Sequence, residues 1–433
     1  MTIEDTSYNK SLYVAMDIGK NVHMLGAYAG FELRPVLSPR KIRSHGAGYE
    51  AVVGWLDSWL ADEQYEQVVL GHEPTGIYHQ NWSYALSQRY AGERSKLVYR
   101  FLNPVVVKRK RQVLQQGRPR KSDPIDIWAI AHCLRDGLGY PAYLPTGAEL
   151  QLTLWARQQR QYQSQKRRQE KQLLALVDQL WPGLVVKVRQ FEKMHPELAP
   201  PVPLVQSKPL QRQSVQAILC HCPNPYEFQA LGVAGIQAFL RHHVGRCGPR
   251  TAQCAYQLPR QALLPPPAVA DLLAPRLQAE AMAYVALLDQ LHQLEATVAA
   301  FVPHTPAAVL TTIPGVSPLL AARYLAYLGH HRRFTSAAQV WAFAGLDVVT
   351  SESGDYRRLG RITRKGPPGL RDTLYLIGLH TARHLPPVAR IYQRALTAGK
   401  GKVGATLHAA HKANRLCFRL LYEQLPFDPA FYL

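Results

Sequence analysis

Cysteine is scarce in this chain, which has 433 residues and six cysteines. They are too few and too scattered for a disulfide framework. Cys220, Cys222, Cys247 and Cys254 could conceivably hold zinc, but their spacing lacks the paired CxxC of a zinc knuckle. We therefore expect ordinary thiols at all six positions, which are Cys133, Cys220, Cys222, Cys247, Cys254 and Cys417.

Long hydrophobic runs are also missing. No apolar segment approaches the roughly 20 residues that cross a bilayer, and the first ten residues, MTIEDTSYNK, lack the apolar core of a signal peptide. The sequence therefore predicts a cytoplasmic protein without a membrane partner.

Acidic residues are few: Asp and Glu total 30 against 51 Lys and Arg, which gives a net charge of +21. A charge of this size implies a polyanionic partner, and without a membrane segment we expect that partner to be nucleic acid. The length is too great for one ordinary domain and predicts two or three.

Two short apolar segments each lead to a carboxylate. Residues 11–20 (SLYVAMDIGK) predict a central strand that carries Asp17 near its carboxyl end, and residues 67–71 (QVVLG) predict a second strand followed by Glu73. Further strand-like and helix-like segments alternate up to about residue 130, which predicts an α/β domain with a mixed sheet. These segments are 24–29 (hairpin partner), 48–61 (helix), 77–90 (helix) and 96–102 (strand).

A second pair of acids, Asp123 and Asp126, lies three residues apart in KSDPIDIW. Pro124 suits the first turn of a helix, so Asp123 is expected at or near the N-cap and Asp126 one turn on. Taken singly, each of the four acids could be a turn, loop or cap residue. Together they predict an oxygen-lined site for Mg²⁺, or Mn²⁺, of the kind that activates a nucleophile in phosphodiester chemistry.

Basic residues immediately precede the Asp pair. Such a run is often a solvated surface, but here it stands where phosphates would have to lie, so we expect it to bind the nucleic-acid backbone. The residues are Lys108, Arg109, Lys110, Arg111, Arg118, Arg120 and Lys121.

The middle of the chain, residues 148–301, is predicted to be helical. Two long helical stretches, 148–181 and 268–301, could pair as a coiled coil within one chain or between chains. Between them, residues 182–267 are rich in proline and turns, with a small helical module at 224–243, and we interpret them as an insertion of unassigned role.

The last unit, residues 302–433, contains two segments of interest. Residues 311–318 (TTIPGVSP) suit either a helix-hairpin-helix that presents amides to phosphate or a simple turn between packed helices. Residues 347–369 are predicted to form a loop with Ser351 and Ser353, and a serine that attacks a phosphodiester needs nearby positive charge. That charge would come from Arg357, Arg358, Arg361, Arg364 and Lys365.

In order along the chain, these motifs resemble those of the bacterial insertion-sequence transposases of the IS one-ten class, DEDD recombinases guided by a bridge RNA. The matching motifs are MDIGK, HEPTGIY, KSDPIDIWAIA, TIPGV, RFTSAAQVWAFAGL, ESG, GRITRKGPPGLR and GKGKV. They cover both ends of the chain, whereas the middle adds only a helical pattern.

The resemblance implies a RuvC-like domain of the ribonuclease-H fold in residues 1–147, with Asp17, Glu73, Asp123 and Asp126 as metal ligands. It implies a mainly α C-terminal transposase domain in which Ser353 forms a covalent phosphoserine link to DNA. It also implies donor and target DNA, a structured guide RNA encoded by the element, and a homodimer that assembles into a homotetramer. Such a bacterial enzyme would be associated with the nucleoid when it acts.

Two features depart from the family pattern. Asp347-Val348-Val349 stands where the family usually carries a proline, and Ser351 lies close enough to Ser353 that the register rests on the following glycine. The alternatives are a site-specific DNA invertase, a RuvC-like metal-dependent nuclease that uses water, and a noncatalytic nucleic-acid-binding protein.

Overall fold

The computed structural model describes residues 10–74, 76–92, 96–115, 122–185, 188–198, 204–205, 208–353 and 356–432. Within these ranges, residues 189–190, 349–353, 356–361 and 431–432 are described by their backbone alone. The chain divides into two compact units, Met1–Leu144 and Pro145–Leu433.

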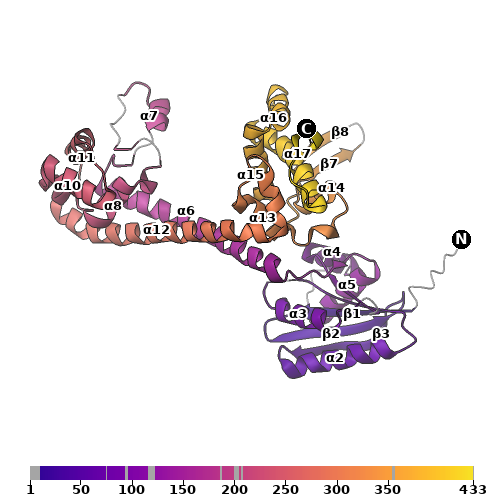
Figure 1. Ribbon diagram of the computed structural model, residues 1–433. Helices are drawn as coiled ribbons and strands as arrows, with labels where there is room; N and C mark the ends of the chain where they lie inside the picture. The colour runs from indigo at the N-terminus through magenta and orange to yellow at the C-terminus, as the bar shows by residue number, and fades with distance from the viewer. Residues whose placement is uncertain are drawn as a thin grey trace. The chain divides into compact units, whose positions relative to one another are not determined.

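The first unit is an α/β domain built on a mixed sheet, as predicted (Figure 1). The strand order is β3-β2-β1-β4-β5-β6; β1, β4 and β5 run parallel, whereas β2 and β3 are antiparallel to their neighbours. Its elements are β1 (Ser11–Ile18), β2 (Val22–Ala29), β3 (Arg34–Arg43), α2 (Gly46–Ala61), β4 (Gln67–His72), α3 (His79–Arg89), β5 (Leu97–Phe101), α4 (Pro104–Leu114), α5 (Asp123–Arg135) and β6 (Tyr140–Pro141).

Both faces of the central strand β1 are buried. Leu12, Val14 and Met16 pack into the core with α2 and α3, whereas Tyr13 and Ala15 pack into the core with α4 and α5. A strand covered on both sides is expected to be apolar throughout, because successive side chains point to opposite faces. This explains the unbroken run that marks β1 in the sequence.

Helix α5 lies close to the sheet because small residues face it. Gly26 of β2 and Gly71 of β4 are both in register with Ala15 of β1, which makes a row of small residues across three strands. A Cβ at Gly26 would lie 2.9 Å from Ile127 Cγ2 of α5, and a Cβ at Gly71 would overlap Leu134 of the same helix. The row therefore fixes where α5 crosses the sheet.

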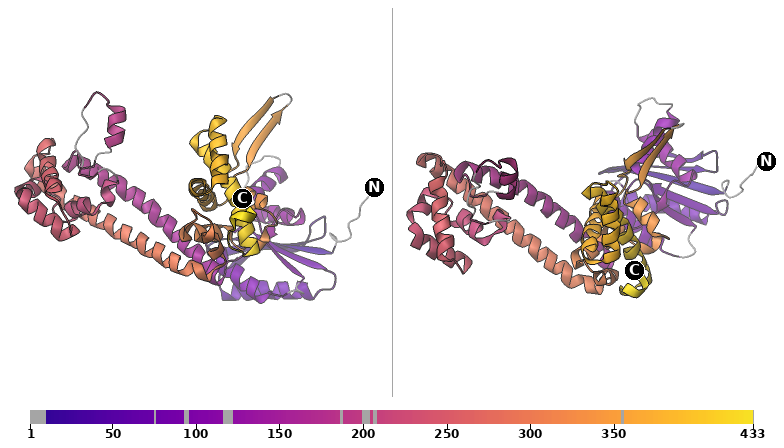
Figure 2. Two further views of the ribbon diagram at one scale, coloured as in Figure 1. Left: turned by 45° about the horizontal axis from the view of Figure 1, so that its top comes forward. Right: turned by 90° about the horizontal axis from the view of Figure 1, so that it is seen from above.

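The second unit begins with two long helices that pack against each other, α6 (Gly147–Leu180) and α12 (Pro267–Phe301) (Figures 1 and 2). Of the two pairings left open by the sequence, the structure shows the one within a single chain. One end of the pair, with Leu152 and Leu294, belongs to the core of the C-terminal helices. The other end, with Leu173 and Leu277, belongs to a separate core.

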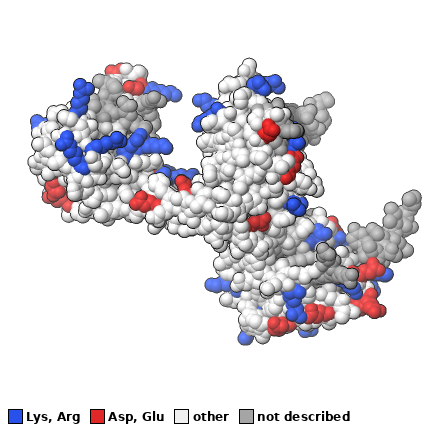
Figure 3. Space-filling view, in the orientation of Figure 1, with Lys and Arg blue, Asp and Glu red and all other residues white. Residues whose placement is uncertain are grey.

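The segment between the two long helices is more helical than its proline content suggests. It forms a helical module with its own core around the buried Trp181 and Phe228. Figure 3 shows Lys and Arg side chains gathered on one face of this module. Its helices are α7 (Val188–Met194), the 3-10 turn η1 (Pro209–Gln211), α8 (Gln213–His221), α9 (Pro225–Ala230), α10 (Gly232–Val244) and α11 (Pro249–Gln261).

The C-terminal part of the second unit is mainly α, with one β-hairpin. The expectation of a loop over residues 347–369 is wrong, because β7 and β8 pair antiparallel there and α15 begins at Pro368. Val348, Val349 and Thr350 are β-branched strand formers, and Gly354-Asp355 is a hairpin signal in the sequence. The elements are η2 (Val302–His304), η3 (Pro306–Thr312), α13 (Pro318–Leu328), η4 (His331–Arg333), α14 (Ala337–Phe343), β7 (Val348–Ser353), β8 (Tyr356–Ile362), α15 (Pro368–His384), α16 (Pro386–Thr397), α17 (Lys402–Glu423) and α18 (Pro429–Tyr432).

The turn before α13 is packed against another helix. Gly315 adopts a φ of +92°, and a Cβ there would lie 2.9 Å from the carbonyl of His380 in α15. Ser317 accepts a hydrogen bond from the amide of Leu320, which caps α13. Of the two alternatives for this segment, the structure favours a turn between packed helices.

None of the six cysteines forms a disulfide, as expected, and Cys220 and Cys247 are buried in the core of the helical module. Among the described helices, none has the length and apolarity that a membrane span requires.

The contact between α15 and α17 tests this packing. A Cβ at Gly378 would lie 2.5 Å from the backbone nitrogen of Ala410, so Gly378→Ala should lower stability by about 1–3 kcal/mol through overpacking. At Gly404 of α17 the added Cβ would meet Lys400 at an ordinary 3.5 Å, so Gly404→Ala should be neutral or stabilising by up to about 1 kcal/mol. Calorimetric unfolding of the full chain measures both, and equal midpoints would contradict the close contact.

Candidate catalytic site

Asp17 lies near the end of β1, and Glu73 directly follows β4, the parallel neighbour of β1. Met16 of β1 is in register with His72 of β4, and each carboxylate is carried by the next residue. Asp17 continues the alternation of Tyr13 and Ala15, which places it on the α5 face of the sheet. Both acids are partly buried. Ligands commonly bind at such carboxyl ends of parallel strands.

His72 holds the backbone of Glu73 in place. The ring is buried, and burial lowers the pKa of His72 to about 4, so it is neutral at physiological pH. Nδ1 lies 3.0 Å from the carbonyl of Glu73, while Nε2 lies 2.6 Å from the hydroxyl of Tyr99 and 3.1 Å from that of Ser83. Since the carbonyl can only accept, Nδ1 carries the proton and Nε2 accepts from a hydroxyl.

The Asp pair begins helix α5, close to the predicted arrangement. Ser122 occupies the N-cap, Asp123 is the first helical residue and Asp126 follows one turn later. Asp123 is exposed, whereas Asp126 is only 8% exposed and accepts a hydrogen bond from Arg111 of α4. Two carboxylates in the first turn also stabilise the helix, because they lie at the positive end of its dipole.

Packing directs α5 toward the strand that carries Asp17. Ile127, which follows Asp126, lies against Gly26, and Gly26 is in register with Ala15, two residues before Asp17. However, the described side chains contain no group of three or more His, Cys, Asp or Glu that could hold a metal ion. Arg111 supplies the positive charge at Asp126. The four predicted residues offer carboxylate oxygens, which are the donor type that Mg²⁺ prefers.

The basic run before the Asp pair lies on helix α4, which the sequence analysis did not predict. Lys108 and Arg109 are exposed, whereas Lys110 pairs with Asp136 and Arg111 pairs with Asp126. Burial alone would raise the pKa of Asp136, but hydrogen bonds from Lys110 and Arg135 outweigh it and hold that pKa below its usual range. Two of these four residues therefore tether α4 to α5, and two face solvent. Arg118, Arg120 and Lys121 lie outside the described residues.

Ser353 is the last residue of β7. In the ladder of the hairpin, Ser353 is in register with Tyr356, Glu352 with Arg357, and Ser351 with Arg358. The strand opposite the serines therefore carries two of the predicted arginines, and Arg361 follows on it. Side chains on both strands up to Arg361 lie outside the description, whereas Arg364 and Lys365, which follow β8, are exposed.

The base of the hairpin is fastened to its neighbours. The amide of Thr363 donates to the carbonyl of Asp347 at 2.8 Å, and that of Arg364 donates to the carbonyl of Gly345 at 2.9 Å. Arg371 of α15 donates to the carbonyl of Ala344 at 2.9 Å. The hairpin thus extends from a fixed junction between α14 and α15, and the unusual Asp347-Val348-Val349 segment leads directly into β7.

Two family models match the chain. Residues 14–182 match a model of the IS110-type DEDD domain, described as Transposase. Residues 307–393 match a model described as Transposase IS116/IS110/IS902 family. The first match contains the four acids, and the second contains Ser353 and its hairpin.

Two proteins of Streptomyces coelicolor are similar to this chain. One is assigned as the mini-circle transposase for IS117 and is 30% identical over 287 residues, which cover 60% of each chain. The other is the insertion element IS110 uncharacterized 43.6 kDa protein, 25% identical over 217 residues, which cover 49% of this chain and 53% of the relative. The chain thus spans a little over half the length of each of these relatives.

Burial of His72 makes the stability of the first unit depend on pH. As pH falls below 6.5 the unfolded chain binds a proton that the folded chain excludes until about pH 4, so stability should fall across this window by about 3 kcal/mol. His72→Phe removes this contribution, and its unfolding midpoint should change less between pH 7 and about pH 4. The measurement is calorimetric unfolding of both proteins at matched pH values, and the same pH dependence in both would contradict a neutral buried ring.

Proposed function

We propose, since the chain belongs to the IS110 class of insertion-sequence transposases, that it is an RNA-guided DNA recombinase that cuts and rejoins strands through a covalent phosphoserine intermediate. The observation that carries most weight is the register of β1 with β4, which sets Asp17 and Glu73 side by side at the strand ends. The mixed sheet around them supports a RuvC-like domain over residues 1–147. Residues 148–301 would be the helical middle, and 302–433 the transposase domain.

Asp17, Glu73, Asp123 and Asp126 would hold the divalent cation, Mg²⁺ or Mn²⁺. A bound ion would stabilise the charge that develops on a phosphodiester during strand transfer. Arg111 already neutralises Asp126 in this structure, which supports a site built for positive charge. Arg111 would have to release Asp126 when an ion binds, and the phosphates beside α4 would be its new partners.

Ser353 would supply the nucleophile. Its Oγ forms a bond to phosphorus, the bond from phosphorus to one strand oxygen breaks, and the proton of the serine hydroxyl leaves to a base or water. A hydroxyl from the exchanged strand then attacks the phosphoserine and releases Ser353. Each step exchanges one phosphodiester-type bond for another, so no external energy source is needed. Arg357, Arg358, Arg361, Arg364 and Lys365 would stabilise the charge on the phosphate.

The partners that we propose are donor DNA, target DNA and a structured guide RNA encoded by the element. The net charge of +21 and the exposed Lys108 and Arg109 support polyanion binding. We further propose a homodimer that assembles into a homotetramer on DNA, so that acids and serine from different protomers act on one phosphate.

Three alternatives differ from this proposal in their DNA sites or in their chemistry. A site-specific DNA invertase would use the same residues on other DNA sites. A RuvC-like nuclease would need the acids but not the serine, and a noncatalytic binding protein would need neither. The family match favours the transposase.

Replacing the serine separates a serine recombinase from the nuclease and from the noncatalytic binding protein. Ser353→Ala should abolish the covalent protein–DNA adduct and strand exchange, because the alanine has no nucleophilic oxygen. Adducts are detected as protein that stays bound to labelled DNA in denaturing gels. Ser351→Ala, two residues earlier on the same strand, is the matched control and should keep the adduct. Continued cutting by Ser353→Ala without an adduct would instead indicate a nuclease.

Replacing an acid tests the metal assignment. Asp126→Asn should abolish strand exchange in Mg²⁺ while leaving RNA binding nearly intact, because basic surfaces supply that affinity. Strand exchange and RNA binding are measured on the same preparation by gel assays. Normal recombination by Asp126→Asn in Mg²⁺ would refute the assignment.

A further inference from the structure

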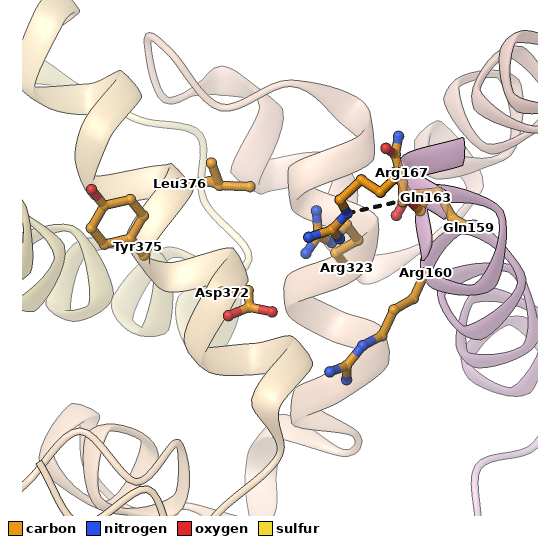
Figure 4. Close-up of a pocket in the computed structure, with 8 residues that line it drawn as sticks. All are labelled: Gln159, Arg160, Gln163, Arg167, Arg323, Asp372, Tyr375 and Leu376. Atoms are coloured by element: carbon orange, nitrogen blue, oxygen red, sulfur yellow. Dashed lines mark hydrogen bonds between the residues drawn. The ribbon is translucent and has the colours of Figure 1, made fainter. Parts of the chain in front are cut away.

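A cavity in the second unit is lined mainly by basic side chains. It lies between α6, α13 and α15 and has a volume of about 600 Å³. Arg160 and Arg167 reach into it from α6, Arg323 from α13 and Asp372 from α15 (Figure 4). Arg160, Arg167 and Asp372 are exposed, so the cavity opens to solvent. The segments predicted from the sequence to bind nucleic acid do not include it.

The walls of the cavity are held together independently of any ligand. Tyr327 of α13 donates to the carbonyl of Ala156 in α6 at 3.2 Å, and the hydroxyl of Thr153 in α6 lies 3.3 Å from the carbonyl of Ala326 in α13. The Tyr327 ring also lies against Gly369 in the first turn of α15, where a Cβ would overlap it. The cavity is therefore preformed.

Arg323 is the most unusual residue of the cavity. Its Nε is buried and has no hydrogen-bond partner among the described residues. Burial lowers the pKa of Arg323, Tyr327 and Asp372 act in the opposite direction, and Arg160 lowers that pKa further. A buried donor on a charged group costs free energy when it has no acceptor. An anion in the cavity would offset the cost of burying the Arg323 charge.

The arrangement suits a phosphate diester. Three guanidinium groups face a single carboxylate, so the lining carries an excess of positive charge. Guanidinium donors match phosphate oxygens in a fork geometry and bind them more strongly than neutral donors do. Arg167 is itself held by a hydrogen bond from its Nε to the carbonyl of Gln163 at 3.2 Å, which leaves its terminal amino groups to reach the cavity.

We propose that this cavity binds a backbone phosphate of the nucleic acid on which the protein acts, with Arg323 donating from the floor and Arg160 and Arg167 from the rim. The inference rests on the proposed function, because it is the family that supplies a nucleic-acid substrate. It adds a binding site whose arginines, on α6 and α13, belong to neither of the two basic segments that the sequence pointed to.

The site is connected to the serine hairpin through α15. Arg371 of that helix holds the carbonyl of Ala344 at the base of the hairpin, and its neighbour Asp372 lines the cavity. A strand held by the cavity is therefore anchored to the helix that also fastens the hairpin. The cavity therefore positions the strand relative to the hairpin and also contributes to the affinity for nucleic acid.

The test compares Arg323→Gln with Arg276→Gln, which removes the same charge from an exposed position on α12. Binding of a random-sequence DNA duplex and of an RNA hairpin is measured over a range of salt concentrations. Arg323→Gln should weaken binding and reduce the slope of log K against log salt by about 0.9 for one lost contact to duplex DNA or about 0.7 for a single strand. Arg276→Gln should leave that slope nearly unchanged.

Thermal unfolding distinguishes a binding role from a structural one. Removing a buried cation without a partner should leave the midpoint of Arg323→Gln unchanged or raise it. A lower midpoint with unchanged binding of both probes would overturn the proposal, as would an unchanged salt slope for both. A slope change with DNA alone identifies a DNA strand as the ligand, and a change with RNA alone identifies the guide.

Two further variants make the test independent of whether Arg323→Gln folds and of whether the proposed serine chemistry is correct. Arg160→Gln changes an exposed rim residue and should give the same change in slope if Arg323→Gln fails to fold. In a Ser353→Ala background the slope change of Arg323→Gln should persist, because binding does not need the nucleophile. Loss of the proposed chemistry would therefore leave the inference about the cavity testable by itself.

Discussion

The close approach of α5 to the sheet is the constraint on which the first unit depends. Gly26, Ala15 and Gly71 present almost no side chain across three strands, so Ile127 and Leu134 can lie directly on the backbone. The start of the helix, with its two acids, is then fixed relative to β1 and β4. A larger residue in this row would lift α5 and move Asp126 away from the face that carries Asp17.

Polar contacts then hold individual residues within the arrangement of helices and strands that packing sets. His72 is kept neutral by burial and donates to the carbonyl of Glu73, so the residue after β4 is held by a side chain of the strand itself. Lys110 and Arg111 join α4 to α5 through Asp136 and Asp126. Basic residues that look like one charge run in the sequence therefore divide into a tethering pair and an exposed pair, because a helix turns neighbouring residues to different sides.

The second unit is organised by a different principle. The long helices α6 and α12 each contribute to two cores, one shared with the helical module and one with the C-terminal helices. The polar centre of α6 belongs to neither core, and its Arg160 and Arg167 line the cavity with Arg323 of α13. Glutamine and arginine side chains in the middle of α6 thus line a cavity together with a residue of α13, a helix more than a hundred residues later in the sequence.

The sequence by itself determined the elements with a clear period or composition. The apolar run of β1, the helix before β4 and the two long helices appear where their patterns predict them, because burial on one or both faces imposes those patterns. It also pointed to the acids, since each follows a strand or opens a helix. The edge strand β3 was missed because Pro35 and Pro39 interrupt it and most of its residues are exposed. Helix α4 was missed although Asn103-Pro104 is a sound start signal.

Only the tertiary structure decided which charges face one another. Arg111 and Asp126 are 15 residues apart. The whole helical module and α12 lie between Arg160 and Arg323 in the sequence. Neither placement has a period that a sequence pattern could display. The same is true of the small residues under α5, which line up only because three strands adopt one register. A periodic burial pattern involves residues close together in the sequence, so the sequence alone can reveal it. Which charged side chains meet, and which helices touch which strands, depends on the distant elements that the fold brings together.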